Sequence, residues 1–118
     1  TMSFRSRIKP FVDAEIAASM AQRKLENHRA EFAHLERAHI LGQASTIEHV
    51  RTHCLMLLWS VRNKAPKEFV GQVMRIVGAA TKTAMGWVPR GNIGGANVSP
   101  FKPMALPADL EAILSSTQ

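Results

Sequence analysis

The chain lacks, or nearly lacks, several features on which common folds and enzyme chemistries depend. It contains one cysteine and no tyrosine among its 118 residues. A single cysteine excludes an internal disulfide framework and fits a reducing cytoplasm, which is the predicted location. The longest apolar run, LMLLW at 55–59, is far too short to span a membrane. Since no segment sustains the period-two alternation of a β-strand, we expect an all-α protein.

The net positive charge of the chain suggests nucleic acid as a partner, but the distribution of the basic residues does not support one. The net charge is +6, and 15 residues are lysine or arginine. These basic residues are scattered along the chain, and no basic run is interleaved with aromatic residues that could stack on bases. The pattern therefore predicts a basic, solvated surface and disfavours a nucleic-acid partner.

Apolar residues recur at helical spacing in four segments, at about 8–25, 28–42, 46–63 and 66–84. Asn27 and Ser45 are predicted N-caps, Gly42 stands where helices commonly end, and Pro66 suits a first turn. Residues 86–107 hold four of the seven glycines and four of the six prolines, so about 86–106 is predicted to be irregular. A short last helix is expected at about 107–115. The prediction is one helical domain, residues 1–118, with four antiparallel helices in two hairpins and an irregular C-terminal wrap.

Two arrangements of these hairpins stay open. Their starts lie about 37 residues apart, near the helix-turn-helix unit of tetratricopeptide-like repeats, but a closed four-helix bundle fits as well. The apolar stripes predict the inner faces, and they make Cys54 a buried, inert thiol. The predicted inner face of the third helix is Ile47, Val50, Cys54, Leu57, Leu58 and Val61. That of the fourth is Phe69, Val73, Ile76, Val77 and Ala80. Trp87, Val88, Phe101 and Met104 are expected to anchor the C-terminal wrap.

Residues 34–54, HLERAHILGQASTIEHVRTHC, hold four of the five histidines and the only cysteine. Across a turn centred near Ala44, His39 and His49 fall at the same height, and Glu36 and His53 fall one turn further along. Glu36 and His39 form an i,i+3 pair, and His49 and His53 form an i,i+4 pair. Such pairs bind transition metals in helical proteins. These four residues are therefore candidate ligands for zinc, nickel or copper.

A structural interpretation of the same residues competes with the metal site and is favoured by residue statistics. His39 falls in an apolar stripe beside Leu35, where a histidine is usually a hydrogen-bonded core residue. His49 and His53 fall about 80° or more from the apolar stripe of their helix and could face solvent or a third helix. No zincin pattern and no nucleophile–base pair is present, which favours a non-enzymatic role. Two hypotheses therefore stay open: a metal-binding protein, or a helical interaction module or homodimer with structural histidines.

Several longer phrases resemble a family of small bacterial proteins that is catalogued only as a domain of unknown function. The phrases are HLERAHILGQ at 34–43, EHVRTH at 48–53, GQVMRIVGAATKTAMGWVPRGN at 71–92 and GGANVSPFKPM at 94–104. The resemblance covers essentially the whole chain and implies a bacterial source and a single all-helical domain. It implies no activity, substrate or cofactor. The four candidate ligands lie within these phrases, whereas Cys54 lies just past one of them.

Overall fold

The computed structural model describes residues 2–82 and 105–118, and in these ranges the chain forms five helices and no strand. The helices are α1 (Phe4–Lys24), α2 (His28–Gly42), α3 (Thr46–Arg62), α4 (Pro66–Lys82) and α5 (Ala108–Thr117). The all-α prediction is confirmed. The predicted wrap and its four anchoring side chains lie outside the described residues, apart from positions 105 and 106, and so does the expected end of the fourth helix.

Local capping explains where these helices begin. The Oγ atom of Ser3 accepts a hydrogen bond from the backbone N–H of Ser6 at 3.2 Å, so α1 begins at Phe4 and not near residue 8 as predicted. Asn27 and Ser45 cap α2 and α3 in the same way, as predicted.

The two hairpins repeat the same turn. Glu26 and Lys64, which lie between the paired helices, both adopt left-handed backbone angles, with φ of 58° and 50°. α1 ends at Lys24, and α3 ends 38 residues later at Arg62. The starts of α2 and α4 are also 38 residues apart. The two hairpins are thus equivalent units of the chain.

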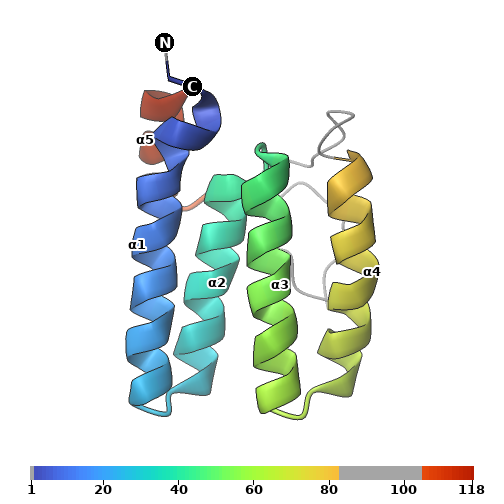
Figure 1. The fold of residues 1–118 in the computed structure, drawn as a ribbon. Coiled ribbons are helices and arrows are strands. Elements are labelled where there is room, and N and C mark those ends of the chain that lie inside the picture. The colour runs from blue at the N-terminus through green and yellow to red at the C-terminus, as the bar shows by residue number, and fades with distance from the viewer. Residues whose placement is uncertain (1, 83–104) are drawn as a thin grey trace.

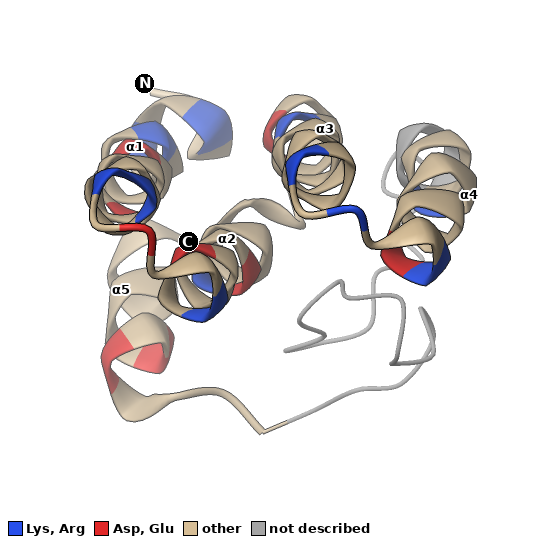
Figure 2. Ribbon diagram, turned by 90° about the horizontal axis from the view of Figure 1, so that it is seen from below, with Lys and Arg blue, Asp and Glu red and all other residues tan. Residues whose placement is uncertain are grey.

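The four long helices form an open array. They stand side by side in chain order (Figure 1), and the end view places α1 and α4 at opposite ends of the row (Figure 2). Each helix contacts its neighbour in the chain, and α1 also touches α3, but within the described residues α1 does not contact α4. The closed bundle is therefore not formed. In the described ranges, no helix has both the length and the hydrophobicity needed to cross a membrane.

The apolar core lies at one end of this array. It joins α1, α2 and α5, and α5 packs beside the first turns of α1 (Figure 1). Its fully or almost fully buried members are Ile8, Val12, Ala38, Ile40, Leu41 and Leu110. This packing fixes the C-terminal half of α2, and with it the position of the residues that follow its last turn.

Gly42 ends α2, as predicted, and has a second role that the sequence did not predict. It is the last residue of α2, and a Cβ atom on it would lie 2.8 Å from the Cβ atom of Glu48 in α3. Such a contact is far shorter than van der Waals distance, so only glycine lets the first turn of α3 approach α2 this closely. The close approach brings the facing side chains of the two helices together.

Most of the predicted inner faces of α3 and α4 is wrong, although Val50, Leu57 and Ile76 are half-buried; the side chain of Ala80 lies outside the described part. In α3, Ile47, Leu58 and Val61 are 56–58% exposed, and Cys54 is exposed as well. The buried side chains of α3 are instead Glu48, His49, Thr52, His53, Met56 and Ser60. In α4, Phe69, Val73 and Val77 are exposed, whereas Gln72 and Arg75 are buried. The reason is that polar groups on α2, α3 and α4 form hydrogen bonds with one another across the helix interfaces, so their burial leaves the apolar stripes outside.

Candidate metal centre

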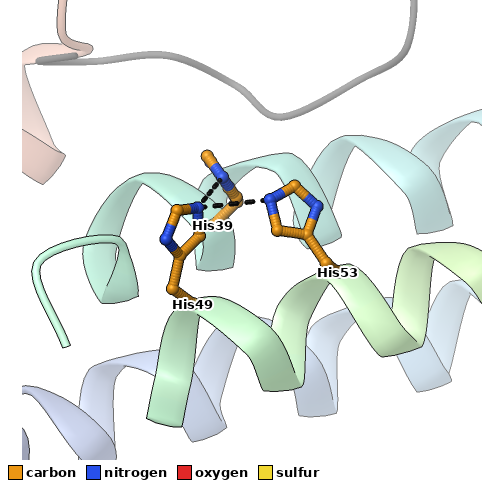
Figure 3. A group of neighbouring side chains, drawn as sticks. All are labelled: His39, His49 and His53. Carbon is orange, nitrogen blue, oxygen red and sulfur yellow. Dashed lines mark hydrogen bonds between the residues drawn. The ribbon is translucent and has the colours of Figure 1, made fainter. Parts of the chain in front are cut away.

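Three histidines from two helices meet in the interior of the array. His39 comes from α2, and His49 and His53 come from α3, and their rings point toward one another (Figure 3). The three residues are 3%, 8% and 2% exposed. The Nε2 atom of His49 lies 2.9 Å from that of His39 and 3.2 Å from that of His53. One ligand nitrogen from each histidine lies within 4.8 Å of the other two.

These separations match those of a metal shell. Zinc binds histidine nitrogen at about 2.0–2.1 Å, so two nitrogens of a tetrahedral shell lie about 3.3 Å apart. The two Nε2–Nε2 distances of 2.9 and 3.2 Å are close to this value. For the third pair, His39 and His53, the separation of the ligand nitrogens is bounded only by the 4.8 Å within which all three lie.

The helical geometry explains why the three rings meet. His49 and His53 are one turn apart on the same face of α3, and His39 lies across the short α2–α3 turn at the height of His49. The matched height of His39 and His49 that the sequence predicts is therefore seen in the structure. Burial of the face that carries these histidines, opposite the apolar stripe, was not predicted.

Glu36, the fourth predicted ligand, is not part of the three-histidine group. It lies one turn before His39 on α2 and is half-buried. Burial, and secondarily the negative charge of Glu68, raise the pKa of its carboxyl group to about 7. The structure therefore places Glu36 near a second carboxyl group from α4.

The other reactive residues of the sequence have separate surroundings. The Nδ1 atom of His34 lies 2.8 Å from the carboxylate of Glu15 in α1, and His28 is exposed. Glu31 and Glu48 are buried but pair with arginines, since Arg62 donates to Glu31 at 2.6 Å and Arg51 donates to Glu48 at 3.0 Å. The Arg62–Glu31 pair joins α3 to α2, whereas the Arg51–Glu48 pair lies within α3, and neither carboxylate belongs to the three-histidine group.

Gln72, which the sequence did not single out, determines the orientation of His53. Its side-chain Nε2 donates to the carboxylate of Glu68 at 2.7 Å, so its Oε1 atom is the group that faces His53. Because this oxygen only accepts, His53 donates its Nδ1–H to it at 2.7 Å. A neutral His53 therefore carries its lone pair on Nε2, which points at the other two histidines. This outer hydrogen bond is typical of metal-binding histidines.

A spacing signal for these α4 residues was present in the sequence. Glu68, Gln72 and Arg75 recur at i, i+4 and i+7 in a helix whose remaining face is apolar. Such a polar stripe is ordinarily interpreted as solvent-exposed. The burial of this stripe depends on the partner helices, which the pattern within α4 does not reveal.

His49 and His53 are neutral at physiological pH. Burial first, and then the positive charges of His53 and Arg75, lower the pKa of His49 to about 3. Burial and Arg75 lower the pKa of His53 to about 4, against the opposing hydrogen bond to Gln72. Neutral imidazole is the form that binds metals, because protonation removes the lone pair.

The described part of the chain thus defines a small all-helical protein with a buried cluster of three histidines that is able to hold a metal ion. The family model described as "Protein of unknown function (DUF3703)" matches residues 6–114, and the chain belongs to this family. No curated protein and no solved structure matches the chain.

Proposed function

We propose that this protein binds one divalent transition-metal ion through His39, His49 and His53. The observation that carries the proposal is the convergence of three buried imidazole nitrogens within 4.8 Å of one another, with two of their separations close to those of a tetrahedral shell. Support also comes from Gln72, which keeps the Nε2 lone pair of His53 directed at this point.

A metal ion would satisfy the cluster more fully than the histidines satisfy one another. Without an ion, the Nε2 atom of neutral His49 carries at most one hydrogen, yet the Nε2 atoms of both His39 and His53 lie within hydrogen-bond distance of it. Buried acceptors that are only partly hydrogen-bonded are costly, by about 1–3 kcal/mol each. An ion at the centre would use the lone pairs of all three rings at once.

The chemistry of the ligands indicates the class of metal. Three neutral nitrogen ligands suit ions of intermediate softness, such as zinc, nickel, copper or cobalt. A soft thiolate ligand is not provided, because the exposed Cys54 lies outside the cluster. With three protein ligands, a fourth coordination position stays open for water or another small ligand. Glu36 would then be a neighbouring carboxyl group and not a ligand.

Titration of the metal-free protein with zinc, followed by calorimetry, tests the proposal. We expect saturable binding of one ion per chain. The matched control is the double variant His28→Ala/His34→Ala, which removes two histidines outside the cluster and should bind zinc with unchanged stoichiometry. A wild-type protein that shows no saturable binding, or a control variant that has lost it, would contradict the proposal.

Exposed apolar side chains favour a second candidate function, self-association through α3 and α4. Val61 of α3 and Val70, Met74 and Val77 of α4 are 57–70% exposed. Val70, Met74 and Val77 recur at i, i+4 and i+7 and so share one face of α4, and exposed apolar faces commonly mark a protein interface. We expect light scattering to give the mass of a dimer, and Met74→Glu to shift it toward the monomer. A wild-type protein that is monomeric at all concentrations would exclude this function.

A further inference from the structure

Arg75 is a buried cation that forms no ion pair within the described residues, although the negative charge of Glu68 acts on it from a longer distance. It lies on α4, one turn after Gln72, and is only 9% exposed. Within the described ranges, the ion pairs involve other arginines, and no carboxylate lies within ion-pair distance of the Arg75 guanidinium group. The other arginines of the helix interfaces, such as Arg51 and Arg62, are paired with glutamates. Arginine is rarely buried unless it is paired, so this exception requires an explanation.

The geometry of α3 and α4 places Arg75 beside the histidine cluster. Gln72 is hydrogen-bonded to His53, and the two helices run antiparallel from a short turn. One turn from His53 toward the start of α3 leads to His49, and one turn from Gln72 along α4 leads to Arg75. Arg75 is therefore level with His49. Consistent with this position, its positive charge lowers the pKa of both His49 and His53.

The charges around the cluster do not balance once an ion is bound. Three neutral imidazoles leave the full double positive charge on a divalent metal, and Arg75 adds a third positive charge. The nearby carboxyl groups of Glu36 and Glu68 supply at most two negative charges, and the pKa of Glu36 is raised. Uncompensated charge is unfavourable in a buried site. The site lacks one negative charge and retains one open coordination position.

We infer that the open metal position and Arg75 together bind a small oxyanion of the bicarbonate or carboxylate class. One oxygen would coordinate the metal, and another would accept hydrogen bonds from the guanidinium group, whose planar fork matches such anions. The inference rests on the proposed metal site, since the first contact is to the ion. It identifies the ligand that this site would recognise.

The test uses the cobalt-loaded protein, because the visible absorption of cobalt(II) responds to its ligands. Bicarbonate, formate and inorganic phosphate are titrated separately. We expect bicarbonate or formate to change the spectrum saturably and phosphate to act more weakly, and Arg75→Met to raise the dissociation constant for the anion at least tenfold. Arg75→Lys, which keeps the charge but not the fork, should give an intermediate value. The control Arg29→Met, at an exposed position of α2, should match the wild type.

The outcomes separate this inference from the proposal on which it rests. If cobalt does not bind to the wild-type protein, the metal site is refuted and the anion site with it. If cobalt binds but the spectrum ignores all three anions, only the anion site is refuted. The same holds if phosphate binds most tightly, or if both Arg75 variants bind the anion as the wild type does. Cobalt affinity that is unchanged or higher in Arg75→Met would show that the variant still folds around the histidines.

Discussion

Replacement of His49 by alanine is expected to lower the affinity for zinc by at least about 100-fold while the helices stay folded. The Nε2 atom of His49 lies within 3.2 Å of the nitrogens of both other histidines, so its loss removes the central ligand. Loss of an outer-shell partner alone commonly costs 10–100-fold in metal affinity, and loss of a direct ligand should cost at least as much. Calorimetric titration gives the affinity, and far-ultraviolet circular dichroism reports the helices.

The folded state of the His49→Ala variant is expected to survive because the substitution removes a buried polar ring from a helix. Alanine has a higher helix propensity than histidine, which partly offsets the lost packing. His34→Ala is the single-site control: His34 also lies on a helix and is partly buried, but its partner is Glu15. If His49→Ala bound zinc as tightly as the wild type, the three histidines would be structural contacts only.

The metal-free protein is expected to lose stability as the pH falls from 7 to 5. His49 and His53 have pKa values of about 3 and 4 in the folded chain, against 6.5 for an unperturbed histidine. Below pH 6.5 the unfolded chain therefore takes up protons that the folded chain does not. The stabilisation is fully present above pH 6.5 and is lost as the pH falls toward the folded pKa values. At pH 5 the loss is about 2 kcal/mol for each imidazole, at 1.36 kcal/mol per pH unit.

The carboxyl group of Glu36 changes the folding stability in the opposite direction as the pH falls, and its replacement supplies a control. Its pKa is raised from 4.5 to about 7, so the folded chain binds a proton more readily than the unfolded chain between these values. This group therefore adds stability as the pH falls and masks part of the histidine effect. Urea denaturation at pH 7, 6 and 5 in the presence of a chelator should show a steeper loss in Glu36→Gln than in the wild type. An unchanged pH dependence in the double variant His49→Ala/His53→Ala would refute the assignment to the histidines.

The helical hairpins and the pairing of heights follow from the sequence alone because they depend on contacts between residues close along the chain. Asn27 and Ser45 cap their helices through side chains that bond to backbone three residues later. His39 and His49 share a height because the turn between them is short. These local terms do not depend on what packs against the helices, so they could be predicted without knowledge of the rest of the fold.

The buried faces of α3 and α4 were decided only by the tertiary structure. Apolar periodicity predicts that Leu58 and Val77 point inward, yet both are more than half exposed. Gln72 and Arg75 are buried instead, and Gln72 is joined to His53, a residue 19 positions away in the sequence. A polar side chain can be buried when its hydrogen-bond partner is supplied by another helix, and a pattern within one helix contains no information about that partner. For the same reason, the pattern within α3 could not predict that Cys54 is exposed or that His53 faces the cluster.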